Sequence, residues 1–386
     1  ALCLTVCLVA LLSSSALAAE GALRGLWVAT VLNLDYPSAP TTDPEVLKAE
    51  ATAILDDALD MGMNAVFLQV RPCSDALYPS SIFPWSRYLT GVQGLEPEGG
   101  FDPLDFWVTE SHARGIELHA WINPYRITRE KDHAGLAPTH PAVLHPEYVV
   151  QHSDGNWYFD PGVPEVRELV IEGVLEIAGK YPVDGIHLDD YFYPGTSFQD
   201  QESFIRHNPD GIGDKESWRR ENVNLLVRDM GRRLHALRPD ISFGISPFGI
   251  WANRSTFPSG SDTAGNQSYF LHSADTRRWV LEGWIDYIAP QLYWEIGHKK
   301  ADYAVLLSWW AGVVRGTDVK LYIGMGDYRM VGAKSGSPWY GLEEIRRQMV
   351  LNRRTPEVAG EIHFRLGSIR AVPGLHDFLR EAHADE

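Results

Sequence analysis

Short apolar segments alternate with helical patterns eight times along this 386-residue chain, and this alternation limits the fold more than any other feature. The strand-like segments cover residues 23–30, 65–70, 117–122, 185–188, 242–245, 287–292, 320–323 and 361–364. The helical patterns cover residues 44–61, 103–114, 164–181, 218–237, 276–283, 303–314, 342–351 and 375–383. Eight such units predict an α/β fold, a closed (β/α)8 TIM barrel, rather than an open sheet.

The first 19 residues have the pattern of an export signal. An apolar run over residues 2–12 is followed by Ala16-Leu17-Ala18, the small-x-small sequence that precedes a cleavage site. The run is too short to span a bilayer, and the lack of an initiating Met or a basic start indicates that the sequence is clipped or that its start is misassigned. We expect cleavage near Ala18, a single barrel domain over residues 20–386 with no integral membrane segment, and a periplasmic or extracellular location.

The charge of the chain restricts its partners. Lys and Arg number 34 against 51 Asp and Glu, a net charge of -17 that opposes binding to nucleic acid or to an anionic membrane surface. The 13 Trp and 16 Tyr provide flat rings suited to the faces of sugars, although any one ring can simply belong to the core. We therefore expect a polysaccharide partner. No GxGxxG sequence follows a strand, and we expect no cofactor; the oligomeric state is left open.

The strand-to-helix connections are much longer than the helix-to-strand turns. The long ones cover residues 71–102, 123–163, 189–217 and 246–275. Long loops in a compact domain are usually functional, and in a TIM barrel these loops share the face that carries the active site. We expect them to form a walled groove at the carboxyl ends of the strands.

Two adjacent carboxylates, Asp189 and Asp190, follow the fourth strand directly. Asp189 has the same parity as His187, so both side chains should point into the mouth of the barrel. Asp190 has the opposite parity, unless the strand has already ended and turned. We expect Asp190 to orient substrate hydroxyls or to form a hydrogen bond with a neighbouring loop. An Asp in this place can also cap a turn, but the pair beside Tyr191 and Tyr193 favours a catalytic site.

Glu295 is the expected partner of Asp189. It closes the segment 289–295 at the end of the sixth strand and could face Asp189 across the mouth. Glycoside hydrolysis usually needs two carboxyl groups on either side of the scissile bond. Trp294 could keep Glu295 dry and raise its pKa, as suits a proton donor. The separation of the two groups, and with it a retaining or inverting outcome, does not follow from the sequence.

Further polar and aromatic residues recur at the strand ends. Most of them share the parity that faces the barrel axis, where buried polar groups need partners or a ligand. A self-contained network that braces the barrel is the alternative, and we prefer it for His119 and His363. The predicted substrate-binding residues are Gln69, Arg71, Trp121, Asn123, Tyr125, Arg126, His187, Tyr191, Tyr193, Gln291, Tyr293, Trp294, Asp327 and Arg365.

Two other functions remain open at this stage. His187 and Asp189 would point the same way as a two-ligand metal fragment, so a metal-dependent polysaccharide deacetylase is one alternative. The chain has no HExxH motif and no Cys/His cluster, and we assign no metal ligands. The other alternative is a noncatalytic carbohydrate-binding barrel.

Five motifs in order resemble the glycosyl hydrolase-like family 10 group of exported bacterial proteins. They are RGLWVAT at 24–30, GMNAVFLQVR at 62–71, HAWINPYR at 119–126, DGIHLDDYFYP at 184–194 and PQLYWE at 290–295. The resemblance implies a TIM barrel and hydrolysis of cell-envelope glycan, with peptidoglycan strands stripped of their peptides as substrate.

A weaker likeness to chitinases concerns the fourth strand alone. In the chitinase motif D-G-x-D-x-D-x-E the acid comes two residues after the last Asp, and the matching positions here are Asp184, His187, Asp189 and Tyr191. Tyr191 therefore stands where a chitinase holds its acid. The likeness implies that an acid must come from elsewhere in the chain, which favours Glu295.

Overall fold

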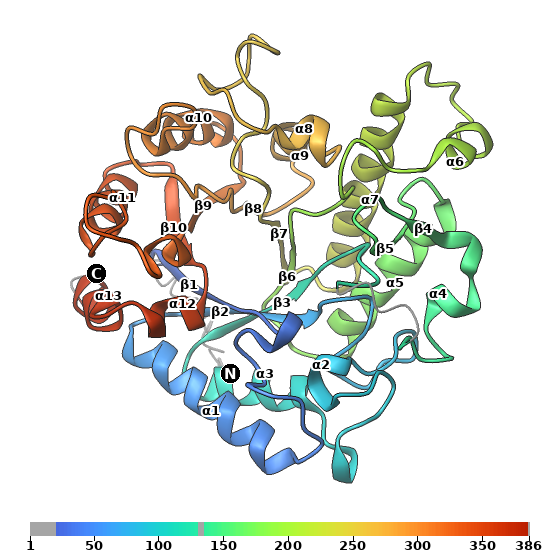
Figure 1. Cartoon of the computed structure of the whole chain (residues 1–386), viewed down its shortest axis with the longest axis horizontal. Coiled ribbons are helices and arrows are strands. Elements are labelled where there is room, and N and C mark those ends of the chain that lie inside the picture. Colours follow the sequence, from blue (N-terminus) through green and yellow to red (C-terminus); the bar gives the residue numbers. More distant parts are fainter. Residues whose placement is uncertain (1–20, 130–134, 385–386) are drawn as a thin grey trace, which may run out of the picture.

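The computed structural model describes residues 21–129 and 135–384, and it confirms the TIM barrel. Eight parallel strands close in the order β1-β10-β9-β8-β7-β6-β3-β2, and Figure 1 shows them as the central ring. The strands are β1 (Leu23–Val28), β2 (Ala65–Arg71), β3 (Glu117–Ile122), β6 (Gly185–Leu188), β7 (Ser242–Ile245), β8 (Tyr287–Ile288), β9 (Lys320–Met325) and β10 (Val358–His363). The predicted export signal lies outside the described residues.

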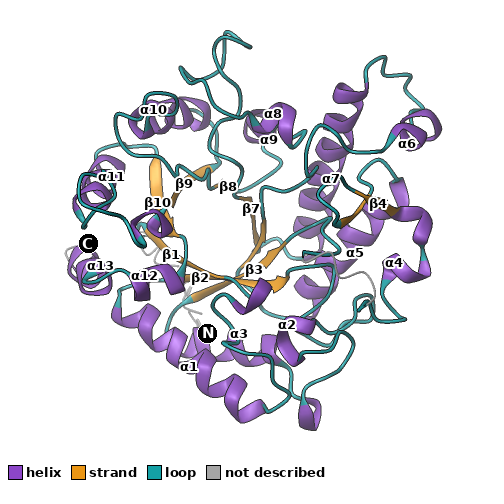
Figure 2. Cartoon of the chain, viewed as in Figure 1, coloured by secondary structure: helices purple, strands orange, loops and turns teal. Residues whose placement is uncertain are grey.

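Helices surround the barrel, as Figure 2 shows. The main ones are α1 (Pro44–Asp60), α3 (Pro103–Ala113), α5 (Pro164–Lys180), α7 (Lys215–Leu237), α9 (Thr276–Leu281), α10 (Tyr303–Val314), α11 (Glu343–Arg353) and α13 (Leu375–Ala384). Proline begins α1, α3 and α5, where its missing N–H costs no hydrogen bond. Asp43 and Asp102 cap α1 and α3 by accepting backbone N–H groups.

The long loops carry shorter elements. These are α2 (Arg87–Thr90), α4 (Pro141–Leu144), α6 (Gln201–Arg206), α8 (Ser268–Leu271), α12 (Leu366–Ala371), the 3-10 helices η1 (Val31–Asn33), η2 (Glu98–Gly100), η3 (Pro146–Tyr148) and η4 (Asp327–Met330), and a hairpin of β4 (Val149–Gln151) and β5 (Trp157–Phe159). The sixth barrel strand is shorter than the predicted 287–292. Pro290 has no N–H to donate to a ladder, and only Gln291 makes further bridges, to Phe248 and Gly324. No helix among the described residues is long and apolar enough to cross a membrane.

Large rings fill the inside of the barrel and leave little room for further side chains. The ring of Phe67 lies 4.5 Å from that of His119, and His187 stacks on Tyr287 at 5.9 Å. A Cβ atom at Gly185 would overlap His119. Glycine at that position therefore lets the inner rings reach the barrel axis.

His187 joins these rings through hydrogen bonds. Its Nε2 accepts from Trp27 Nε1 at 3.2 Å and lies 2.9 Å from Ser246 Oγ, and its Nδ1 lies 3.0 Å from the Tyr287 hydroxyl. Burial lowers the pKa of His187 well below its ordinary value, so the imidazole is neutral. The network braces the base of the barrel mouth.

Two strands depart from the predicted alternation of faces. The register of β2 against β3 shifts between Gln69 and Arg71, so Arg71 leaves the axis-facing row. In β10 it is Ile362 that packs inside the barrel, which turns His363 outward to the helices. The axis-facing assignments of Arg71 and His363 were therefore wrong.

Candidate active site

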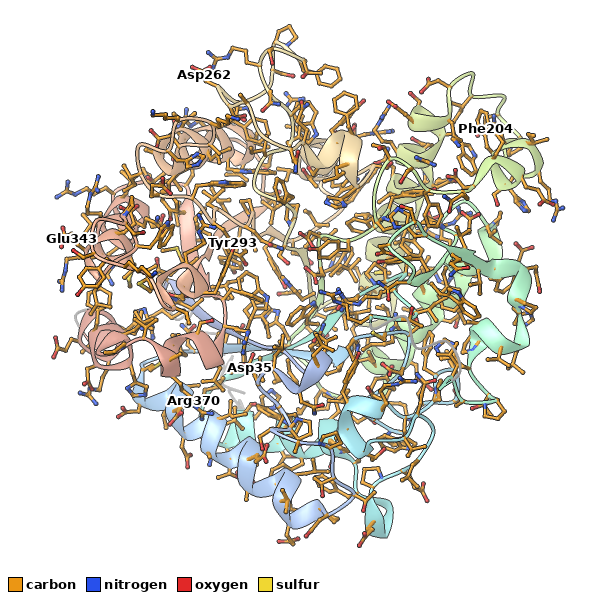
Figure 3. All side chains as sticks on the ribbon, viewed as in Figure 1. Asp35, Phe204, Asp262, Tyr293, Glu343 and Arg370 are labelled. Atoms are coloured by element: carbon orange, nitrogen blue, oxygen red, sulfur yellow. The ribbon has the colours of Figure 1, made fainter. Side chains whose placement is uncertain are left out.

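A cavity of about 360 Å³ lies at the carboxyl ends of the strands, within the size range of ligand pockets. Its lining residues are Trp27, Ala29, Val31, Leu32, Leu34, Gln69, Trp121, Arg126, Arg129, Asp189, Asp190, Tyr191, Ser246, Phe248, Gln291, Tyr293, Tyr328 and Phe364. Figure 3 shows Tyr293 on the inner side of the ring of elements, whereas Glu343 and Arg370 lie at the periphery. Among these lining residues, the carboxylates are Asp189 and Asp190.

A chain of hydrogen bonds supplies an N–H donor to Asp189. The backbone N–H groups of Thr30 and Val31 donate to Gln69 Oε1 at 3.0 and 2.9 Å, so the amide nitrogen of Gln69 must face the other way. It donates to Asn123 Oδ1 at 2.6 Å, and Asn123 Nδ2 in turn donates to Asp189 Oδ2 at 2.7 Å. Each amide is oriented by the one before it. Asp189 Oδ2 therefore receives an N–H and acts as a hydrogen-bond acceptor.

Asp190 has the opposite environment. Its backbone N–H donates to Asp189 Oδ1 at 2.8 Å, and its own Oδ1 is buried with no hydrogen-bond partner in the described structure. Burial raises the pKa of Asp190 well above its ordinary value, and the charge and side-chain hydrogen bond of Asp189 raise it further. Asp190 therefore holds its proton more strongly than an ordinary aspartate does. Such a pair divides into a proton donor and a charged partner.

Aromatic rings form the walls around the two carboxyl groups. Tyr293 stacks on Phe364 with centroids 5.9 Å apart, and Trp27 and Tyr328 meet Phe364 edge-on at 5.8 and 6.1 Å. Trp121 adds a buried indole N–H that has no partner among the described residues. Apolar faces with a few unpaired donors are suited to a sugar ring, whose faces are apolar and whose edges carry hydroxyls.

The structure brings eight predicted site residues to the cavity and places two more next to it. Those that line the cavity are Gln69, Trp121, Arg126, Asp189, Asp190, Tyr191, Gln291 and Tyr293. Asn123 is buried behind Asp189, to which it donates, and His187 lies in the network beneath the mouth. Asp190 reaches the cavity despite its parity because β6 has already ended at Leu188.

Glu295 and Trp294 are not among the residues that line this cavity. Glu295 Oε2 accepts a hydrogen bond from Trp339 Nε1 at 3.3 Å, and Trp294 packs edge-on against Phe248 with centroids 5.5 Å apart. The regular strand ends at Ile288, so its alternation does not extend to residue 295. The structure therefore gives Glu295 a partner other than the expected Asp189.

Five further predicted residues lie away from the cavity. Arg71 is buried with its Cζ atom 4.5 Å from the ring centroid of Phe83. The Cζ atom of Arg219 lies 5.2 Å from the ring centroid of Tyr193. The remaining three have other surroundings. Tyr125 is fully buried, Asp327 bonds His363, and Arg365 pairs with Asp35 in the loop after β1.

Several cavity residues were not predicted from the sequence. They include Trp27, Ser246, Phe248 and Phe364, and from the pair 327–328 it is Tyr328 that lines the cavity. Counting the alternation of β10 from the apolar Ile362 would have pointed to Phe364.

Comparisons with known proteins agree with this geometry. Residues 22–340 match the family described as Glycosyl hydrolase-like 10. The chain belongs to this family. It is 44% identical to the Glycosyl hydrolase YngK of Bacillus subtilis over 92% of this chain and 71% of that protein. It is 40% identical to the Glycosyl hydrolase DigH of Escherichia coli K12 over 89% of this chain and 82% of that protein. The protein is thus a glycoside hydrolase by class.

Solved structures with low sequence identity share the fold. The glycoside hydrolase domain of PgaB (BpsB) from Bordetella bronchiseptica has a TM-score of 0.61 and 15% identity, covering 94% of this chain and 99% of that one. The endo-beta-1,4-mannanase of Thermotoga petrophila has a TM-score of 0.58 and 14% identity, covering 95% and 77%. Both likenesses concern the barrel alone.

The hydrogen-bond chain predicts a pH-dependent cost for Gln69→Glu. The introduced carboxylate can accept from Thr30 and Val31 but cannot donate to Asn123, and turning the Asn123 amide would set its oxygen against Asp189. We expect a loss of about 2–4 kcal/mol in the free energy of unfolding at pH 8. At pH 5 the loss is smaller, because burial raises the pKa of the introduced group and its protonated form can donate.

Denaturant unfolding at both pH values measures this cost. The exposed Gln199, changed to Glu, is the matched control and should alter stability by less than about 0.5 kcal/mol. A Gln69→Glu variant as stable as wild type at pH 8 would contradict the proposed orientation of the chain.

Proposed function

We propose that this glycoside hydrolase cleaves O-glycosidic bonds in a cell-envelope polysaccharide, and that peptidoglycan glycan strands are its substrate. Asp190 is the proton donor and Asp189 is its ionised partner. The observation that carries the proposal is the pair itself, in which Oδ1 of Asp190 is buried without a partner and the carboxyl group of Asp189 accepts two N–H groups. A site that only binds sugar has no need of a buried, protonated acid, which favours catalysis over a noncatalytic barrel.

The closeness of the two carboxyl groups points to the course of the reaction. Retaining glycosidases generally hold their carboxyl groups about 5–5.5 Å apart, and inverting ones about 6.5–9.5 Å apart. Asp189 and Asp190 are neighbours in the chain, and the backbone N–H of Asp190 donates to Asp189 Oδ1 at 2.8 Å. We infer that the two groups act together on one side of the scissile bond and do not flank it. The nucleophile is then a group of the substrate. An acetamido group at C2 of the sugar is suited to this role, as in the substrate-assisted class of glycosidases.

Cleavage proceeds in two steps. The acetamido oxygen bonds to C1 while the bond from C1 to the leaving oxygen breaks, and Asp190 gives its proton to that oxygen. Asp189 accepts the acetamido N–H and stabilises the positive charge that develops there. Water then attacks C1, returns a proton to Asp190 and displaces the acetamido oxygen. The overall outcome is hydrolysis with retention of configuration.

Peptidoglycan strands meet this requirement because their sugars carry acetamido groups, and the family resemblance noted from the five motifs implies the same substrate. Export by the signal-like residues 2–18 would bring the enzyme to it. A metal-dependent deacetylase fits less well. Among the described His, Cys, Asp and Glu residues, the group that could hold a metal is Glu361, His363 and His383, which does not line the cavity.

Two amide substitutions separate the roles of Asp190 and Glu295. Asp190→Asn removes the proton donor and should lower kcat/KM on denuded peptidoglycan strands by about 10²–10⁴. Glu295→Gln keeps a hydrogen-bond acceptor for Trp339 and should stay within about threefold of wild type, less than 1 kcal/mol of transition-state stabilisation. Release of reducing ends, with thermal melts to verify folding, measures both. A folded Glu295→Gln variant without activity would restore the sequence-based pairing with Asp189.

The acetamido requirement is tested on matched substrates. Denuded strands and their chemically de-N-acetylated counterparts present the same backbone, but the second lacks the internal nucleophile. We expect hydrolysis of the first and at least a hundredfold slower release of reducing ends from the second, since the positioned nucleophile supplies several orders of magnitude. Equal rates on both would exclude substrate assistance.

A further inference from the structure

We propose that Glu361, His363 and His383 bind one divalent transition-metal ion, with Zn²⁺ as the first candidate, in the layer between the barrel and its helices. Glu361 and His363 come from β10, and His383 comes from α13. Each residue offers one ligand atom, and these atoms lie within 4.8 Å of one another. The site is separate from the cavity of Asp189 and Asp190 and independent of the proposed function.

The distances suit ligands that share an ion. Glu361 Oε1 lies 3.7 Å from His363 Nε2 and 3.8 Å from His383 Nε2, beyond the normal range of a hydrogen bond. Two atoms that each lie about 2.1 Å from a tetrahedral Zn²⁺ are about 3.4 Å apart. Shifts of a few tenths of an ångström in these side chains would therefore complete the coordination.

The other nitrogen of each imidazole already has a partner. His363 Nδ1 lies 3.0 and 3.1 Å from the two carboxylate oxygens of Asp327, and His383 Nδ1 lies 2.8 Å from the carbonyl oxygen of Met61. Both Nδ1 atoms must then carry the hydrogen, which leaves each Nε2 free to coordinate. A carboxylate or carbonyl behind a ligating histidine is the usual support of a protein metal site.

The carboxylate of Glu361 is oriented in the same way. Asn352 Nδ2 donates to its Oε2 at 2.9 Å, which directs Oε1 to the two histidines. His363 and His383 are 0% and 5% exposed, and neither Nε2 has a hydrogen-bond partner in the described structure. Two unpaired nitrogens beside a buried carboxylate are costly unless a further group bonds them.

The local charge also favours a cation. Glu361 and Asp327 together carry two negative charges, which one divalent ion balances. Protons on both imidazoles would balance the charge equally, but the N–H groups would then face Glu361 Oε1 across gaps too long for hydrogen bonds.

An ion at this place would tie the ends of the barrel together. It would link β10 to α13, and through His383 and the Met61 carbonyl it would reach the end of α1. Figure 1 shows α13 beside α12 and α1, near the place where the last strand closes on the first. The role of the ion is therefore structural, and its removal should loosen the terminal helix.

Metal content and thermal stability test the proposal on the full chain, purified without a histidine tag. We expect elemental analysis to find about one Zn²⁺ per chain. After dialysis against EDTA, the melting temperature should fall, and added ZnCl₂ should restore it progressively with the logarithm of free Zn²⁺. Wild-type protein that binds no stoichiometric Zn²⁺ and melts at the same temperature with and without ZnCl₂ would overturn the proposal.

Paired variants assign the effect to this site. His383→Asn keeps a donor near the Met61 carbonyl but lacks Nε2, and Glu361→Gln removes the charge with little change of shape. Both should lose the bound Zn²⁺ and the response to ZnCl₂. His376→Asn, on the same helix α13, and Asp190→Asn should keep both. Retention of Zn²⁺ in both ligand variants would refute the site, whereas an inactive Asp190→Asn with bound metal concerns the proposed function alone.

Discussion

The active site depends on the N–H groups that donate to the carboxyl group of Asp189. Backbone amides of Thr30 and Val31 orient Gln69, Gln69 orients Asn123, and Asn123 donates to Asp189. A backbone N–H can only donate, so the oxygen of Gln69 must face Thr30 and Val31. The donor and acceptor ends of both amides are therefore fixed along the chain. Burial raises the pKa of the neighbouring Asp190, and the charge of Asp189 raises it further. We propose that the acid chemistry of the site follows from this arrangement.

The barrel interior supports this arrangement mechanically. Trp27, His187 and Tyr287 are joined by hydrogen bonds under the cavity, and the neutral imidazole adds no charge to compete with the carboxyl pair. The same Trp27 lines the cavity from its β1 position. Strands β1, β6 and β8 therefore supply the floor, and β2, β3 and β6 lead to Gln69, Asn123 and Asp189. A shift of one strand would disturb this shared network.

The sequence was sufficient for the architecture because the eight-fold alternation is a long-range pattern with strong local signals. The position of Asp189 followed from the strand before it, and Asn123 and Gln69 followed from alternation in regular strands. Prediction failed where regularity ended. The shifted register of β2 displaced Arg71, and the early end of β8 removed the basis for placing Glu295 opposite Asp189. Local irregularities of this kind depend on tertiary packing, and the alternation of apolar and polar residues in the sequence does not predict them.

The proton on Asp190 can be followed by carbon-13 NMR of the carboxyl resonances of Asp189 and Asp190 during a pH titration. We expect Asp190 to stay protonated at pH values where an ordinary aspartate, with a pKa of about 3.9, is fully ionised. We also expect Asp189→Asn to lower the pKa of Asp190, since the neighbouring charge is removed. An Asp190 that titrates like an exposed aspartate in the wild type, with no response to Asp189→Asn, would show that Asp190 is not the proton donor.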